Sequence, residues 1–278
     1  MSECTHDCST CGEACAERDP KSFLEKQNDA SNIRHMVGIV SGKGGVGKSF
    51  MTGLLACGMS DAGKKTAILD ADITGPSIPF QFGLKDKKAE SDGTFLHPVE
   101  TEKGIKVMSM NLLLPNSTDP VVWRGPVVAG AIKQFYTDVA WGDVDYMLVD
   151  MPPGTSDVPL TAFQSLPLDG IIIVTTPQDL VSMIVEKAVN MARLMNVPIL
   201  GLIENMAYFE CPDCGGRFGI FGPSHVEAIS EDLHIETFAK VPVNYQVTRF
   251  CDLGAIEHID PSVLRPIIQK LLTLPDKE

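Results

Sequence analysis

The stretch Gly42-Lys43-Gly44-Gly45-Val46-Gly47-Lys48-Ser49 decides the fold of this chain. It satisfies the Gly-x-x-x-x-Gly-Lys-Ser pattern of a phosphate-binding loop, and it lies between an apolar strand-like stretch and an apolar helix-like stretch. Its glycines let several backbone N–H groups converge on a phosphate, and the helix that follows presents its positive end. We therefore predict a nucleotide site over residues 42–50, ending at Phe50, in which Lys48 reaches the β- and γ-phosphates and Ser49 ligates Mg²⁺. A glycine-rich turn with a chance lysine would not account for the strand and helix on either side.

Outward from this loop, short apolar runs alternate with longer helical stretches. Strands are expected at Met36–Ser41, Lys65–Leu69, Ile105–Ser109, Tyr146–Val149, Gly170–Thr175, Pro198–Ile203 and Thr237–Val241. Helices are expected at Gly47–Asp61, Pro126–Val139, Leu180–Met195, Ser224–Leu233 and Pro261–Leu272. Nearly continuous hydrophobicity is typical of strands covered on both faces, and crossover helices fit between them. The pattern predicts an α/β fold: one P-loop NTPase domain over residues 35–278, with a mainly parallel sheet covered by helices on both faces.

Composition narrows the class of protein. Of the 278 residues, 44% are hydrophobic and 21% are charged, so the chain can bury a large core. The formal net charge of −13 argues against a broad nucleic-acid or anionic-membrane surface, and the first residues contain no apolar signal core. We therefore expect a cytoplasmic protein with neither nucleic acid nor membrane as a partner. Eight cysteines are then unusual, because in a reducing compartment metal binding or redox chemistry is their leading explanation.

The cysteines separate a small head, residues 1–15, from a large body. The head contains four of them: Cys4, Cys8, Cys11 and Cys15. Four thiolates suffice for a complete site, and the alternatives are an iron–sulfur cluster, zinc and a ligand-delivery tail. Residues 16–34 are polar, and we interpret them as a linker or a solvated helix. Cys57 and Cys251 stand alone in the sequence, and for both we expect packing in the structure.

Carboxylates end two of the predicted strands. Asp70 and Asp72 follow the strand after the phosphate loop, and Asp150 ends a later strand and precedes Gly154. In isolation such residues are mostly caps or turns, but next to a phosphate loop they indicate a Mg²⁺ and hydrolysis site. We expect Asp150 and Asp72 to hold Mg²⁺ through water, Asp72 to orient the attacking water, and Gly154 to lie in a loop that senses the γ-phosphate. Asp70 is a second catalytic candidate, because the sequence does not separate its role from that of Asp72.

The first lysine of the loop, Lys43, is not required by the general pattern. Lys-Gly-Gly-Val-Gly-Lys-Ser resembles the deviant Walker A loop of the MinD/ParA/nitrogenase iron-protein superfamily. The resemblance implies that Lys43 crosses a two-fold interface to the partner subunit's ATP, so that the chain forms a homodimer when ATP is bound. There it would place positive charge where phosphoryl oxygens gain negative charge. It also implies that Asn205, just after a predicted strand, reads the edge of adenine.

Longer motifs resemble one branch of that superfamily, the Mrp-type ATPases that carry iron–sulfur clusters. They cover most of residues 35–258, and they are Asp72-Ile-Thr-Gly-Pro-Ser-Ile-Pro79, Val122-Trp-Arg-Gly-Pro126, Trp141-Gly-Asp-Val-Asp-Tyr146, Asp150-Met-Pro-Pro-Gly-Thr155, Thr175-Thr-Pro-Gln-Asp179 and Glu204-Asn-Met-Ala-Tyr-Phe-Glu-Cys-Pro-Asp-Cys-Gly215. The chain departs from the family pattern at Ile73-Thr74, where tyrosine is common, and at Ser156, where glycine is usual. Neither departure removes a charged group.

Cys211 and Cys214 supply two thiolates at 211–214, whereas tetrahedral zinc and a cubane cluster normally take four protein ligands. A two-fold dimer would supply the other two. The resemblance implies the same arrangement, with one [4Fe–4S] cluster bridged by Cys211 and Cys214 of both subunits. A thioredoxin-like dithiol and a zinc knuckle are the alternatives.

Together these features predict a weak ATPase that carries a [4Fe–4S] cluster and exchanges it with cluster donors and apo iron–sulfur client proteins. Two other classes share the phosphate loop: a positioning ATPase of the MinD/ParA kind, and an ATP-driven reductase resembling the nitrogenase iron protein. The acidic net charge disfavours the first class, and two cysteines in a single Cys-x-x-Cys disfavour the second. Pelleting with liposomes or DNA would test the first, and a comparison of cluster transfer with electron transfer would test the second.

Overall fold

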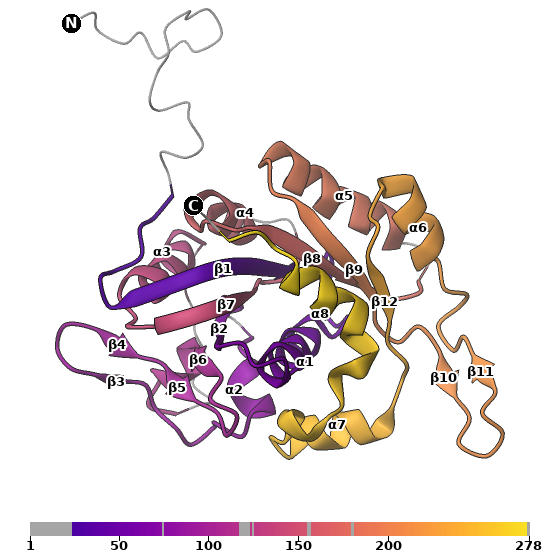
Figure 1. Ribbon diagram of the computed structural model, residues 1–278, viewed down its shortest axis with the longest axis horizontal. Coiled ribbons are helices and arrows are strands. Elements are labelled where there is room, and N and C mark those ends of the chain that lie inside the picture. Colours follow the sequence, from indigo (N-terminus) through magenta and orange to yellow (C-terminus); the bar gives the residue numbers. More distant parts are fainter. Residues whose placement is uncertain are drawn as a thin grey trace, which may run out of the picture.

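The computed structural model describes residues 24–73, 75–116, 123, 125–154, 157–178 and 181–276. Its centre is a sheet of eight strands (Figure 1). Across the sheet they lie in the order β12 (Phe238–Lys240), β9 (Ile199–Glu204), β8 (Gly170–Thr175), β1 (Ser31–Val40), β7 (Gly142–Asp150), β2 (Thr66–Asp70), β6 (Lys106–Met108) and β5 (Val99–Glu100). All neighbouring pairs are parallel except β5 with β6. The predicted α/β fold with a mainly parallel sheet is confirmed.

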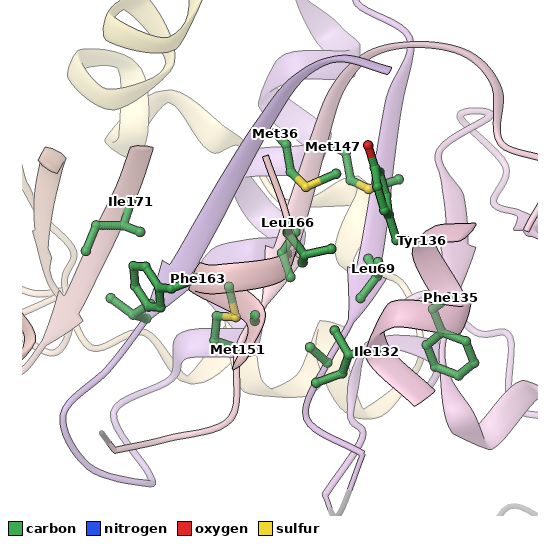
Figure 2. Packing of buried hydrophobic residues seen from close by; sticks show 14 of the residues in the cluster. Met36, Leu69, Ile132, Phe135, Tyr136, Met147, Met151, Phe163, Leu166 and Ile171 are labelled. Atoms are coloured by element: carbon green, nitrogen blue, oxygen red, sulfur yellow. The ribbon is translucent and has the colours of Figure 1, made fainter. Parts of the chain in front are cut away.

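Helices cover both faces of the sheet. One face carries α1 (Lys48–Asp61), α2 (Ile78–Gln81), α8 (Arg265–Leu272) and the short 3₁₀ segments η4 (Ile256–His258) and η5 (Pro261–Leu264), and it packs against Val37 and Ile39 of β1. The other face carries α3 (Gly125–Thr137), α4 (Asp157–Ser165), α5 (Val181–Leu194) and α6 (Val226–Leu233). There Met36 of β1 lies in the same cluster as Ile132 and Phe163 from the helices (Figure 2). Alternate residues of β1 thus enter opposite cores, as the pleat of a strand requires.

Among the described residues, six shorter elements lie outside the central sheet and the helices that cover it. They are β3 (Glu90–Ser91), β4 (Leu96–His97), η3 (Met110–Leu112), β10 (Phe209–Glu210), β11 (Arg217–Phe218) and α7 (Tyr245–Asp252). The β10–β11 hairpin projects from the edge of the molecule that is formed by β12 and α6 (Figure 1). Within the described part of the chain, no helix is both long enough and apolar enough to cross a bilayer.

The first strand begins earlier than the sequence indicated. β1 starts at Ser31, five residues before the expected position, because Ser31 to His35 continue the pairing with β7 from Gly142 to Tyr146. Upstream of the strand, the Asn28 amide donates hydrogen bonds to the carbonyl oxygens of Thr137 and Val139, at 2.7 and 2.8 Å. Residues 31–34, which we expected to be linker, therefore belong to the sheet. Their polar composition misled the prediction, because backbone pairing with β7 places them in the strand although their side chains are only partly buried or exposed.

All seven expected strands are present, but one expected helix is divided and three helices were not expected. The expected helix Pro261–Leu272 is divided into η5 and α8, and Pro266 in the first turn of α8 has no N–H to continue the hydrogen bonding of the preceding turn. The segment packs against the body, since Ile267 and Leu271 are buried. The helices α2, α4 and α7 were not predicted from the sequence, because they are short and their apolar residues show no clear period.

Candidate functional site

The phosphate loop lies between the end of β1 and the start of α1. Gly45 and Gly47 have φ angles of 79° and 83°, a left-handed conformation that favours glycine. Gly47 has a second constraint, because a Cβ there would lie 2.3 Å from the amide nitrogen of Asn205. The loop borders a cavity of about 270 Å³, whose lining residues are Ser41, 43–50, Asp72, Ser77, Gln81 and Pro153. Residues 43–50 and Asp72 of the predicted site are therefore brought together around one cavity.

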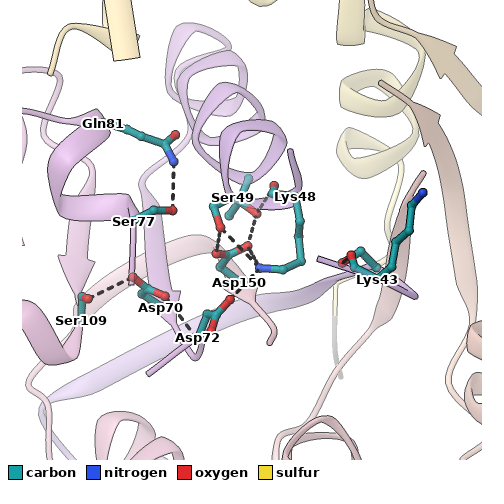
Figure 3. A network of polar contacts seen from close by, with 11 residues as sticks. Lys43, Lys48, Ser49, Asp70, Asp72, Ser77, Gln81, Ser109 and Asp150 are labelled. Atoms are coloured by element: carbon teal, nitrogen blue, oxygen red, sulfur yellow. Dashed lines mark hydrogen bonds and ion pairs between the residues drawn. The ribbon is translucent and has the colours of Figure 1, made fainter. Parts of the chain in front are cut away.

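The side chain of Asp150 lies at the base of the loop and is completely buried (Figure 3). One carboxylate oxygen accepts hydrogen bonds from the Lys48 ammonium at 2.8 Å and the Thr52 hydroxyl at 2.7 Å. The other accepts one from the Ser49 hydroxyl at 2.5 Å. The free-energy cost of burying this carboxylate is offset because it is paired with the Lys48 ammonium and both of its oxygens accept hydrogen bonds. Thr52 was not identified as a site residue from the sequence. Its position four residues after Lys48, which places both side chains on the same face of α1, could have indicated it.

Asp70 and Asp72, which the sequence did not separate, occupy different environments. Asp70 is fully buried, and its carboxylate accepts hydrogen bonds from the Ser109 hydroxyl at 3.0 Å and from the backbone N–H of Asp72 at 3.2 Å. Burial raises the pKa of Asp70 well above its ordinary value, and the nearby Asp150 carboxylate raises it further. Asp72 instead lines the cavity, with a carboxylate oxygen 3.9 Å from the Lys48 ammonium. Asp70 thus lies behind Asp72 and holds its backbone.

Lys43 and Gly154 frame the outer side of the loop. The Lys43 side chain points away from Lys48 (Figure 3), and its ammonium donates a hydrogen bond to the side-chain oxygen of Gln178. Gly154 has a φ angle of 89°, and its N–H donates to the carbonyl oxygen of Ser41 at 2.8 Å. Because Ser41 directly precedes the loop, the segment after Asp150 is tied to the strand end that carries it.

Asn205 touches the loop from the opposite side, at the end of β9. Its amide donates to the carbonyl oxygen of Val46 at 2.9 Å, and its side-chain oxygen accepts from the Met206 N–H at 2.9 Å. The side chain is buried at the loop, which is compatible with a place beside a bound nucleotide.

A second cavity adjoins the first at Phe50. It has a volume of about 310 Å³ and is lined mainly by apolar residues: Phe50, Leu54, Val241, Pro242, Asn244, Gln246, Val247, Phe250, His258, Ile259, Asp260 and Val263. Phe50 also lines the cavity at the phosphate loop. The sequence did not reveal this second cavity, because its walls come from α1, the segment after β12, α7 and the chain before α8.

Cys211 and Cys214 lie in the turn between β10 and β11. The Cys211 N–H donates to the carbonyl oxygen of Gly216 at 2.9 Å, and the Gly215 N–H, at a φ of 68°, donates to that of Cys211 at 2.9 Å. Backbone N–H groups of Asp213 and Cys214, together with the Cys214 thiol, lower the pKa of Cys211, which favours a thiolate. Among the described residues, no three His, Cys, Asp or Glu side chains are grouped as metal ligands. This pair therefore needs ligands from elsewhere to complete a four-coordinate site.

The other cysteines fall into two groups. Cys57 is completely buried in α1, and burial raises the pKa of its thiol to about 12. Cys251 is half-buried in α7 against the core, and burial raises its pKa to about 11. Their expected role as packing residues is confirmed. The four cysteines of the head, Cys4, Cys8, Cys11 and Cys15, lie outside the described residues, and their role stays a prediction.

Comparison with known proteins adds three findings. The family model described as ParA, NUBPL iron-transfer P-loop NTPase, matches residues 32–272. The iron–sulfur cluster carrier protein of Clostridium perfringens is 44% identical over 263 residues, with 88% of this chain and 92% of that protein covered. That of Methanocaldococcus jannaschii is 43% identical over 260 residues, with 91% and 90% covered.

Two solved structures are similar to this chain. A nucleotide-binding protein from Archaeoglobus fulgidus, in complex with ADP, superimposes with a TM-score of 0.76 at 42% identity, over 88% of this chain and 94% of that one. The septum site-determining protein MinD of Pyrococcus horikoshii, complexed with Mg-ADP, has a TM-score of 0.60 at 18% identity, over 86% and 95%. At that identity the second likeness concerns the fold alone.

Proposed function

Since the chain belongs to the iron–sulfur cluster carrier family of P-loop NTPases, we propose that it is an ATPase that carries a [4Fe–4S] cluster. It binds the cluster between two subunits and transfers it to apo iron–sulfur proteins of the cytosol. The observation that carries this proposal is the combination of a complete phosphate loop with a Cys-x-x-Cys turn that has only two cysteine ligands among the described residues.

The nucleotide site supports ATP as the ligand. The polar cavity at the phosphate loop fits phosphates, because Lys48 and the N-terminal end of α1 face it. The apolar cavity beyond Phe50 fits a base, and the two cavities meet at that residue. Ser49 and Asp150 are hydroxyl and carboxylate ligands of the kind that Mg²⁺ prefers, and the ion supplies charge neutralisation for phosphoryl transfer. Asp72 orients the attacking water, and Asp70 positions Asp72.

Two substitutions separate binding from hydrolysis. We expect Lys48→Ala to lose ATP binding, and Asp72→Ala to bind ATP normally but not hydrolyse it. Normal turnover by Asp72→Ala would remove its assigned role.

The position of Lys43 supports a role across a dimer interface, because its side chain points away from Lys48 of its own subunit (Figure 3). Complementation tests this role. Lys43→Ala and Asp72→Ala dimers are each expected to be inactive, whereas a mixed dimer contains one site with both groups and recovers activity. No recovery on mixing would show that Lys43 does not act on the partner's nucleotide.

Exposed apolar side chains around the cysteine hairpin also support a dimer. Phe218 and Ile220 are 58% and 57% exposed, and Tyr245, which shares a cavity lining with Cys211, is 75% exposed. Large apolar side chains gathered at one edge are typical of a protein–protein contact surface. A subunit that covers this edge would bring a second pair of thiolates to Cys211 and Cys214.

Iron content after anaerobic reconstitution tests the cluster. To exclude the head, its four cysteines are replaced by serine in the full chain, and about four irons per dimer should remain. Adding Cys211→Ser and Cys214→Ser should abolish iron binding, whereas adding Cys251→Ser, the matched thiol control, should not. Full iron retention without Cys211 and Cys214 would contradict the proposal. The iron and zinc contents of the wild-type protein then show which metal the four cysteines of the head bind.

A further inference from the structure

The cysteine hairpin belongs to an excursion of the chain, residues 206–224, that begins and ends at neighbouring points of the body. It leaves directly after Asn205 at the end of β9 and returns at His225, the residue before α6 (Figure 1). Along it, the Ala207 N–H donates to the carbonyl oxygen of Val241 at 2.9 Å, and the Val243 N–H donates to that of Tyr208 at 2.7 Å. The excursion is thus fastened to the sheet close to where it starts.

Glu204, the last residue of β9, fastens its other end. A carboxylate oxygen of Glu204 accepts a hydrogen bond from the backbone N–H of His225 at 3.1 Å. The carbonyl oxygen of Glu204 accepts the Val241 N–H at 2.9 Å, so its backbone is held in the sheet as well. One residue therefore joins the start of the excursion, its return point and the adjacent strand.

Glu204 and Asn205 point to opposite sides of the sheet. Leu202 packs in the core that contains α6, and Ile203 packs in the core that contains α1. Since side chains alternate along a strand, Glu204 faces α6 and Asn205 faces the phosphate loop, as their hydrogen bonds show. Two consecutive residues therefore contact the nucleotide loop on one side of the sheet and His225, the return point of the cysteine excursion, on the other.

The carboxyl group of Glu204 lies in a buried and incompletely hydrogen-bonded position. The residue is 1% exposed, and its second carboxylate oxygen has no hydrogen-bond partner among the described residues. Glu204 also makes no ion pair within the described part of the chain, and the N-terminal end of α6 offers it partial positive charge. An unsatisfied buried carboxylate opposes folding, and an uncharged side chain of similar size would avoid this cost. Such local conflicts are concentrated at functional positions.

We propose that Glu204 is a positioning residue that couples the phosphate loop to the Cys211–Cys214 hairpin, through its hydrogen bond to His225. The inference rests on the proposed function, because it assigns a nucleotide to the Asn205 side and a cluster to the hairpin. A nucleotide that restricts the motion of Asn205 also restricts the end of β9. The hydrogen bond from His225 to Glu204 then restricts the point where the excursion returns to the body.

Hydrogen–deuterium exchange of the metal-free full chain, with and without Mg-ADP, tests the coupling. Wild type should show ADP-dependent protection both at the phosphate loop and at the amides of residues 209–218. Glu204→Gln keeps the acceptor without the charge and should retain both responses. Glu204→Asp keeps the charge on a side chain one methylene shorter, and it should lose the response at 209–218 while binding ADP with unchanged affinity. Glu204→Met, which has no acceptor, is the second loss variant if the aspartate variant does not fold, and protection of β1 and β7 reports the fold.

A wild-type hairpin that does not respond to ADP would overturn the coupling, as would equal responses in all four proteins. A response that is retained by Asp but lost by Gln would show that charge, rather than the hydrogen bond, acts, and it would also overturn the assignment. The iron content of the wild type is independent of these outcomes. Failure of the coupling is therefore distinguishable from failure of the cluster site.

Discussion

Replacing Gly47 by alanine tests how closely the phosphate loop and Asn205 are packed. At a φ of 83°, alanine costs about 1 kcal/mol more than glycine. The new Cβ would lie 2.3 Å from the Asn205 amide nitrogen, so Asn205 must move and lose its 2.9 Å hydrogen bond to Val46, worth about 1 kcal/mol. In the free protein the loop relaxes, but a bound nucleotide requires the original conformation. The sum of about 2 kcal/mol therefore appears in binding, as an ADP affinity about 30-fold weaker.

Isothermal titration of Gly47→Ala with Mg-ADP measures this loss. Gly63→Ala is the matched control, because Gly63 has a φ of 77° but no atom within 4 Å of a new Cβ, and it lies outside the site. It should lower stability slightly and leave ADP affinity unchanged. The double variant Gly47→Ala with Asn205→Ala should lose less affinity than the sum of the single losses, since the clash is gone. Affinity within threefold of wild type in Gly47→Ala, about 0.7 kcal/mol, or additive losses in the double variant, would refute the steric argument.

Three further predictions concern buried polar groups and thiols. Thr52→Val removes one of the hydrogen bonds to the buried Asp150 and should lower the free energy of unfolding by about 1–2 kcal/mol in urea titrations, with Thr52→Ser largely retaining it. Burial raises the pKa of Asp70 above 3.8, so ionisation of this carboxyl destabilises the folded state as the pH rises. The stability of Asp70→Asn relative to wild type should therefore increase between about pH 4 and about pH 8. An equal stability difference between the two proteins at both pH values would contradict this reasoning. Alkylation at about pH 8, followed by peptide mass spectrometry, should modify the exposed Cys214 rapidly and leave Cys57 unmodified until the chain unfolds.

Much of the nucleotide site could be predicted because its residues follow local rules. The spacing of glycines and lysine in the loop, and an aspartate at the end of an apolar strand, are readable along the chain. The parallel sheet then brings the ends of β1, β2 and β7 to one edge, and Asp150 meets Lys48 there at 2.8 Å. The Cys211–Cys214 pair could also be predicted from the sequence, and within the described part of the chain no third ligand joins it.

Other features depend on contacts between segments far apart in the chain, and no local sequence pattern predicts them. Thr52 is a neutral residue inside a helix, and its role appears only when α1 packs beside Asp150. The different environments of Asp70 and Asp72 arise because Ser109, 39 positions from Asp70, lies behind one of them. Similarly, the polar residues 31–34 become strand only because β7 pairs with them.

The fold class, the phosphate loop with its Lys48 and Ser49, and the cysteine pair could be predicted from residue types and their spacing over a few positions. Three features became visible only in the folded chain: Asp70 holds the backbone of Asp72 rather than facing the cavity, an apolar cavity adjoins the loop at Phe50, and Glu204 ties the return point of the cysteine excursion to β9. Those facts come from the packing of segments far apart in the chain, where burial and hydrogen-bond geometry set what each side chain can do.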